Sequence, residues 1–270
     1  MIDGEDDALD VPRWLPLTRF VLARLEDAGE IFMLIGSVLR ELPAGMRNLG
    51  LTIVQMASIG LGSMPLTVIV ALFTGAVAAV QASYQFRDYV PMIYLGTVIG
   101  KSVVIELGPV LTALVVGGRV SAAIAAELGT MVVTEQVDAM ETLGISPVRY
   151  LVVPRVLAAV LMLPVLTVFA DIVAILGGYL VAVLTLGVST HTFTSGLRLY
   201  FKLQDVWSGL IKAFFFGGII ALMGCFYGLR SSGGAEGVGD STTRAVAASC
   251  LLILIVDYLL ASFLFRVLFA

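Results

Sequence analysis

Five apolar runs, each long enough to cross a lipid bilayer, constrain this chain more than any other feature of its sequence. A membrane-spanning helix needs about 20 predominantly apolar residues, and hydropathy places such runs at residues 63–85, 92–132, 148–187, 205–229 and 244–269. Charged residues make up only 13% of the 270 residues, against about 25% in soluble domains. The sequence therefore predicts an all-α integral membrane protein with five transmembrane helices.

Two of the runs are too long for one upright crossing, and each contains a proline. Pro109 frees the carbonyl of Ile105 in the second run, and Pro164 interrupts the third in the same way. We expect these helices to tilt, kink or project beyond the bilayer. Residues 46–62 fit either an interfacial segment or the start of the first span.

Glycines recur inside the predicted spans. Because small residues let helix backbones approach closely in a membrane, we expect tight packing within the bundle or at a dimer face around the pairs at 117–118, 177–178 and 217–218 and the GxxxG spacings at 96–100 and 224–228.

Residues 1–45 differ from the rest of the chain. Residues 1–10 are acidic, unlike a secretory signal. From Trp14 to Leu42 apolar residues recur at helical spacing, but charges interrupt the run too often for a span. We interpret residues 1–45 as an acidic tail and an amphipathic helix in the membrane interface; the alternative is a helix packed on a soluble partner.

Basic residues predict the orientation, since cytoplasmic segments carry an excess of them. With the N-terminus inside and the C-terminus outside, the cytoplasmic segments hold Arg13, Arg19, Arg24, Arg40, Arg47, Arg149, Arg155, Arg230 and Arg244. Residues 133–147 and the glycine-rich stretch 230–243 then lie in the cytoplasm. We expect the second of these to be a flexible loop, followed by a cap at Asp240 or Ser241.

Arg119, Glu127 and Asp171 are among the charged residues inside the predicted spans. Ionised groups at membrane depth are costly and mark function or a buried ion pair. Arg119 and Glu127 lie eight residues apart, about 12 Å along a helix, so each must meet another helix. Asp171 is the candidate partner of Arg119, and a structural network is favoured over contact with a substrate.

A short acidic segment separates the second and third spans. Thr134 fits a helix cap, and Gly144 and Pro147 fit the end of a helix that we place at 134–146. In a loop where basic residues are usual, this helix carries Glu135, Asp138 and Glu141, with Met140 among its apolar residues. It suits docking on a soluble partner; a solvated connecting helix is the alternative.

Several functions are disfavoured. Residues 96–102 imitate a phosphate-binding loop but have three residues between the glycines, where the motif needs four. His191 is the only histidine, so we expect no metal site, no cofactor and no catalytic constellation. The net charge of −4 argues against nucleic-acid binding.

An ordered series of motifs resembles the MlaE/YrbE family, the permease subunits of Mla-type ABC phospholipid transporters. The motifs are ELGPVLTALVVGGR (106–119), AAELGTM (125–131), TEQVDAMETLGISP (134–147) and VVPR (152–155), and the similarity covers most of residues 46–270. The resemblance implies a homodimer in the bacterial inner membrane, each protomer having an elbow helix, five spans and a coupling helix.

The resemblance also implies partners. A cytoplasmic ATPase would bind the coupling helix and use ATP and Mg²⁺, with a STAS-domain protein often attached to it. A periplasmic MCE-domain protein would exchange phospholipids with a pocket between the protomers. The permease itself would be no enzyme.

Residue by residue, the resemblance places six positions at the pocket or its gate and four at the ATPase contact. The pocket positions are Glu106, Tyr89, Lys212, Arg244 and Asp257, with Lys101 as a possible substitute for the arginine that relatives carry at Ile105. The coupling positions are Glu135, Asp138, Met140 and Glu141. The competing hypothesis is an ion-coupled secondary transporter using Glu106, Asp171 and Asp257, although no inverted repeat is visible.

Overall fold

The computed structural model describes residues 16–46, 48–86 and 90–268, and within these ranges all regular secondary structure is helical. Five helical units are long and apolar enough to cross a membrane: Leu49–Phe86, Tyr94–Val133, Val148–Leu184, Leu203–Leu229 and Gly234–Val267. The predicted all-α architecture with five spans is confirmed.

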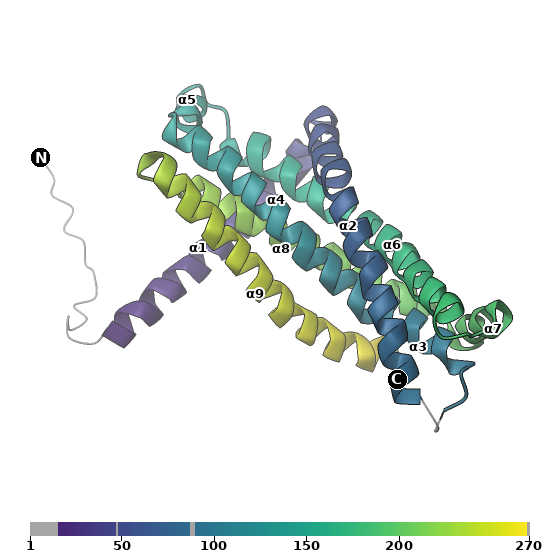
Figure 1. Ribbon diagram of the computed structural model, residues 1–270. Coiled ribbons are helices and arrows are strands. Elements are labelled where there is room, and N and C mark those ends of the chain that lie inside the picture. Colours follow the sequence, from purple (N-terminus) through teal and green to yellow (C-terminus); the bar gives the residue numbers. More distant parts are fainter. Residues whose placement is uncertain (1–15, 47, 87–89, 269–270) are drawn as a thin grey trace, which may run out of the picture.

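The spans form an elongated bundle with a short helical element at either end (Figure 1). In chain order the elements are α1 (Pro16–Gly45), α2 (Leu49–Phe86), α3 (Tyr94–Ser102), η1 (Val103–Leu107), α4 (Gly108–Val133), α5 (Gln136–Thr142), η2 (Val148–Val152), α6 (Val153–Leu184), α7 (Thr190–Tyr200), α8 (Leu203–Leu229) and α9 (Gly234–Leu268). Helix α5 lies at one end of the bundle, and α3 and α7 lie at the other.

Helix α8 is the centre of the bundle, packed against α4, α6 and α9, while α2 packs mainly on α6. Within the most apolar 18 residues of each helix, 61% of α8 is buried in the bundle, compared with 28% of α2 and 17% of α9. Close packing depends on glycine, as predicted: a Cβ on Gly217 would lie 2.5 Å from the carbonyl oxygen of Ala159, and one on Gly177 would lie 2.2 Å from that of Leu72. The helices α2 and α9 therefore leave long apolar faces uncovered.

Both long spans contain a π-helical turn just before a proline. The turn η1 ends two residues before Pro109, and η2 ends two residues before Pro154. Proline lacks an N–H and crowds the carbonyl four residues earlier, and a π turn accommodates this by widening the helix. The irregularity predicted at Pro109 takes this form, whereas α6 continues as a helix through Pro164.

Three boundaries differ from those expected. Most of residues 46–62 belong to α2, so they are the start of the first span. The fifth span starts at Gly234, so the prediction of a flexible loop at 230–243 was wrong, and Asp240 and Ser241 lie inside α9 instead of capping it. Tertiary packing outweighs the low helix propensity of glycine here, because Val238 packs beside Gly129 of α4.

Helix α1 is fixed to the bundle by ion pairs at two places. Glu41 accepts a hydrogen bond of 2.8 Å from Nε of Arg149, just before α6. Asp27 and Glu30 contact Arg230 at the end of α8, at 2.8 and 3.2 Å. Other α1 side chains, among them Phe32 and Met33, are exposed. Helix α1 thus has one side on the bundle and another exposed, and its place in the membrane interface stays a prediction.

Candidate functional site

A buried lysine on the central helix joins three spans. Nζ of Lys212 in α8 lies 2.5 Å from a carboxylate oxygen of Glu106 in η1 and 2.9 Å from one of Asp257 in α9. The contact to Glu106 is also a hydrogen bond. The Lys212 side chain is 1% exposed, that of Asp257 16% and that of Glu106 44%. Glu106 is therefore the accessible member of the cluster.

Local sequence explains this geometry. One turn before Lys212, Gly209 lets α8 approach η1 so closely that a Cβ there would lie 2.3 Å from the carbonyl oxygen of Val104. The π turn preceding Pro109 sets the direction of Glu106. A buried cation in the membrane is tolerated when carboxylates neutralise it. We call Glu106, Lys212 and Asp257 the charged cluster; it brings together three of the six predicted pocket residues.

A groove of about 680 Å³ lies between α2 and the unit formed by α3, η1 and α4. Leu107, the chain neighbour of Glu106, lines it. Its walls are mostly apolar, and its polar groups include Gln81, Gln85 and Ser102. This combination suits a molecule with long apolar chains and a polar end.

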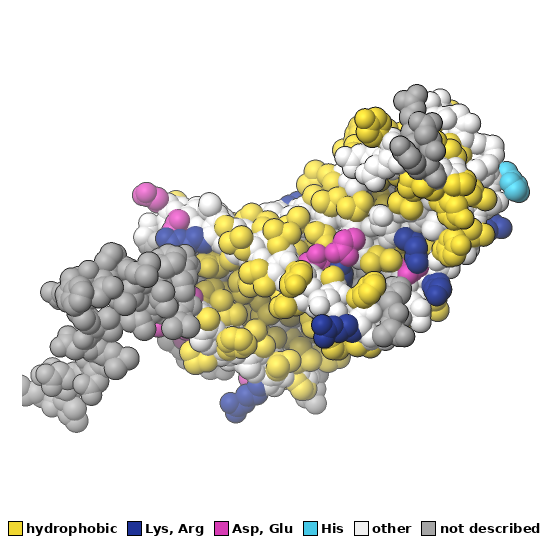
Figure 2. Space-filling view, turned by 90° about the horizontal axis from the view of Figure 1, so that it is seen from below, with side chains coloured by type: hydrophobic (Ala, Val, Ile, Leu, Met, Phe, Trp, Pro, Cys, Tyr) yellow, Lys and Arg dark blue, Asp and Glu magenta, His cyan; other side chains and the backbone are white. Residues whose placement is uncertain are grey.

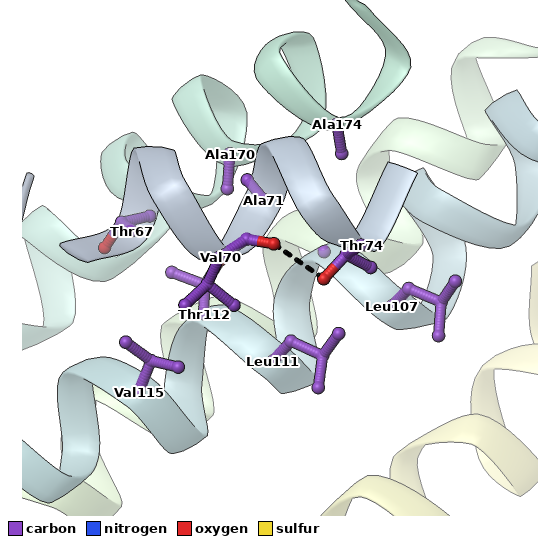
Figure 3. Close-up of a pocket in the computed structure, with 11 residues that line it drawn as sticks. Thr67, Val70, Ala71, Thr74, Leu107, Leu111, Thr112, Val115, Ala170 and Ala174 are labelled. Carbon is purple, nitrogen blue, oxygen red and sulfur yellow. Dashed lines mark hydrogen bonds between the residues drawn. The ribbon is translucent and has the colours of Figure 1, made fainter. Parts of the chain in front are cut away.

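Next to this groove, the helices α2, α4 and α6 pack closely against one another. Figure 3 shows Val70 and Thr74 of α2 opposite Leu107 and Leu111, around a cavity of only about 10 Å³. Thr74 donates its hydroxyl proton to the carbonyl of Val70, 2.8 Å away, so it presents little polarity to the cavity. The contact of α2, α4 and α6 is thus a packed seam and forms a floor for the groove.

The other predicted pocket residues lie elsewhere. Lys101 does not replace the missing arginine beside Glu106; its Nζ lies 3.6 Å from Asp205 at the start of α8. Arg244 is exposed and pairs with Asp240 one turn earlier in α9, at 2.7 Å. Tyr89 lies outside the described residues.

The predicted network of Arg119, Glu127 and Asp171 does not form as one unit. Arg119 donates a hydrogen bond of 2.9 Å to the hydroxyl of Ser63 in α2. In the described part of the chain no ion pair joins it to Asp171, so that prediction was wrong. Instead, Asp171 packs where Gly108 lacks a side chain, with Oδ1 buried and without a hydrogen bond.

Glu127 finds its cation on the third span. Its Oε1 lies 2.8 Å from a guanidinium nitrogen of Arg155, whose side chain is only 4% exposed. Arg155 also donates a hydrogen bond of 2.7 Å to the carbonyl of Leu151 in η2. The pair thus joins α4, which precedes α5, to the segment that follows it. Sequence reasoning missed this role of Arg155, although its position in an apolar run after Pro154 was a visible signal.

Helix α5 presents its acidic residues to solvent. Asp138 and Glu141 are exposed, Met140 is half-buried, and Val137 anchors the helix in the core. The helix spans Gln136–Thr142, shorter than the predicted 134–146, because Thr134 caps the end of α4. Glu135, the residue before the helix, has a φ of 60°, and Gly144 after it has a φ of 74°. The left-handed backbone at Glu135 and at Gly144 therefore makes a sharp turn on either side of α5, which projects from the end of the bundle.

These features define a multi-pass membrane protein: five packed spans, a charged cluster that joins three of them and an exposed acidic helix at one end. The chain belongs to the MlaE permease family, because the family model described as Permease MlaE matches residues 52–263.

Named relatives agree with this. A probable ABC transporter permease protein of Rickettsia typhi is 44% identical over 219 residues, 81% of this chain and 85% of the relative. One of Synechocystis is 42% identical, covering 87% and 89%. The chloroplastic protein TRIGALACTOSYLDIACYLGLYCEROL 1 of Arabidopsis thaliana is 35% identical, covering 97% and 74%. The chain is therefore a transporter subunit of the ABC permease class.

Proposed function

We propose that this chain is the phospholipid-conducting permease of an ABC transporter in a bacterial inner membrane. It works as a homodimer between a cytoplasmic ATPase, with or without a STAS-domain subunit, and a periplasmic MCE-domain protein. The carrying observation is the charged cluster, whose Glu106 lies one residue along the chain from the lining of an apolar groove. Glu106 is a half-exposed carboxylate, and its chain neighbour Leu107 lines the groove of about 680 Å³, so a charged group and an apolar path lie on the same turn of the second span.

The uncovered faces of α2 and α9 support the homodimer. Exposed apolar side chains on them include Phe73, Val77, Tyr258, Leu259 and Phe263. Figure 2 shows hydrophobic side chains over much of one face of the molecule, interrupted by small groups of charged atoms. Two such faces opposed to each other would enclose an apolar cavity between two copies of the charged cluster.

A lipid substrate is also supported by one relative's name. The Arabidopsis protein is named after trigalactosyldiacylglycerol, a lipid with two acyl chains. We extend this from a lipid in general to a phospholipid because the motifs of this chain resemble phospholipid-transporting permeases.

Reconstitution tests the proposal. The chain, its ATPase and its MCE-domain partner are placed in liposomes of phosphatidylethanolamine and phosphatidylglycerol containing a fluorescent phospholipid, and ATP-dependent transfer is followed. Glu106→Gln should slow transfer about tenfold, equivalent to about 1.4 kcal/mol in the barrier, while the complex still assembles. The matched control is Glu236→Gln, an exposed carboxylate at the start of α9.

Two results would overturn the proposal. One is a wild-type complex that hydrolyses ATP but transfers no lipid. The other is a chain that transports alone on an ion gradient, which would restore the secondary-transporter hypothesis. If Glu106→Gln prevents assembly, Glu106 is a structural member of the ion pair, and the pocket assignment fails.

A further inference from the structure

A second groove, of about 1020 Å³, lies at the α5 end of the bundle. Its walls come from α1, the last turns of α8 and the first half of α9. Its position follows from Gly129 of α4, near the start of α5, which touches Ser231 and Val238 beside the groove. It is thus separate from the charged cluster.

The α9 wall is one continuous helical face. Nine α9 residues line the groove, and six of them follow spacings of four, three, four, three and four: Gly237, Ser241, Arg244, Ala248, Leu251 and Ile255. Such spacing keeps side chains on one side of a helix. The small residues Gly237 and Ser241 near the start of the helix make room for the groove. The large apolar residues Leu251 and Ile255 line it farther along α9.

Polarity divides the groove along its length. At the α5 end the lining carries two ion pairs, Arg230 with Asp27 of α1 and Arg244 with Asp240, and the side chains of Arg244 and Asp240 are 65% and 57% exposed. Beyond them the lining is apolar. Arg244 and Ile255 are eleven residues apart, about 16 Å along a helix, and one leaflet of hydrocarbon is about 15 Å thick. The groove therefore has the length and polarity of one leaflet.

We propose that this groove binds one phospholipid from the leaflet on the α5 side, with its phosphate between Arg230 and Arg244 and an acyl chain along Leu251 and Ile255. The inference rests on the proposed function in taking lipid as the substrate class, and it adds a loading site in that leaflet. Arginine forks suit phosphate oxygens, and Asp240 suits a headgroup amine.

A second copy of the chain fits this groove less well. A packed helix would bury the charges at its rim, and desolvating ions costs several kcal/mol each. A lipid headgroup leaves these charges in the hydrated interface. The apolar face suited to a second copy lies farther along α9, at Tyr258 and Leu259.

Photo-crosslinking tests the site without requiring transport. The full-length chain is placed in bilayers of phosphatidylethanolamine and phosphatidylglycerol containing phosphatidylethanolamine with a diazirine on its acyl chain. After illumination, mass spectrometry maps the adducts. We expect adducts concentrated on Leu251, Ile255 and, across the groove, Ile31 of α1. Adducts spread equally onto Leu254, which is exposed but does not line the groove, would overturn the site in favour of ordinary boundary lipid.

Two variants sharpen the test. Ala247→Trp fills the groove from an exposed position and should lower groove adducts about tenfold, equivalent to about 1.4 kcal/mol, whereas Leu254→Trp should not. Arg244→Gln removes one of the two arginines proposed to contact the phosphate and should lower the yield of lipid adducts in the groove. Arg266→Gln, at the other end of α9, is the control and should not. Unchanged adducts in Ala247→Trp would overturn the proposal, as would crosslinking between two chains through Ala248→Cys. Failed transport with an intact adduct pattern would count against the proposed function alone.

Discussion

The charged cluster is the most consequential group of single residues. Lys212→Met leaves two carboxylates near each other at membrane depth, and breaking a buried ion pair by removing one partner costs about 3–5 kcal/mol. We expect a large loss of thermal stability in detergent. The triple variant Lys212→Met, Glu106→Gln, Asp257→Asn should regain most of it, because no unpaired charge remains. Equal melting temperatures for the single variant and the wild type would contradict the ion-pair geometry.

Glu135 presents a second residue-scale case, in which side chain and backbone can be separated. Its φ of 60° is left-handed, a conformation that costs a residue with a Cβ about 1–2 kcal/mol and glycine little. If Glu135 serves only as a turn residue, Glu135→Gly should bind the ATPase as well as wild type and Glu135→Ala should not exceed it. If its carboxylate docks the ATPase, both variants should weaken co-purification equally, and the comparison of the two yields decides between these roles.

The partner of a charged residue could be predicted from the sequence only where both residues belong to the same helix. Helix spacing was sufficient to show that Arg119 and Glu127 cannot pair with each other. It could not show that Glu127 meets Arg155, or that Arg119 meets Ser63, because those contacts depend on which spans are neighbours. Glu106, Lys212 and Asp257 were identified by family motifs, and their mutual contact required the fold.

Among the elements, α5 carries the sharpest prediction. Reversing two exposed charges, Asp138→Lys with Glu141→Lys, should release the ATPase from the membrane complex while the permease stays folded, because the rigid helix would then present cations to the same surface. Co-purification of the ATPase measures this. Glu236→Lys, also exposed near the α5 end, controls for a charge reversal outside α5, with +2 in net charge against +4 for the double variant. Undiminished ATPase recovery would show that α5 is only a connecting helix.

Element boundaries were predictable where hydropathy alone decides them. The five spans follow from apolar runs, since the bilayer demands about 20 apolar residues. The start of α9 was missed because its glycines disfavour a helix in isolation, and packing of Val238 near α4 stabilises it. The π turns η1 and η2 leave no trace in hydropathy; only the prolines that follow them hinted at an irregularity.

For the whole molecule, the decisive property is the uneven covering of its spans. With α8 largely buried and α9 mostly uncovered, one copy of the chain leaves an apolar face that a second copy can cover. Lipid tails are as apolar as the uncovered side chains, so association of two copies depends on shape and polar contacts. On the uncovered face of α9, the charged cluster provides such a polar contact through Asp257. Its half-exposed Glu106 would then lie at the margin of the cavity between the two copies.

We therefore predict that two copies meet through the outer half of α9. In a variant with Cys225 and Cys250 replaced by serine, Tyr258→Cys and Leu259→Cys should each form a disulfide-linked dimer in membranes. Ile172→Cys, equally exposed on α6 (61% exposed), should not, because α6 would face lipid instead. Crosslinking should also persist in Ala247→Trp, since the groove at the α5 end lies away from this contact. A monodisperse monomer that still transfers phospholipid, or equal crosslinking at all three positions, would show that the permease does not need a second copy at this face.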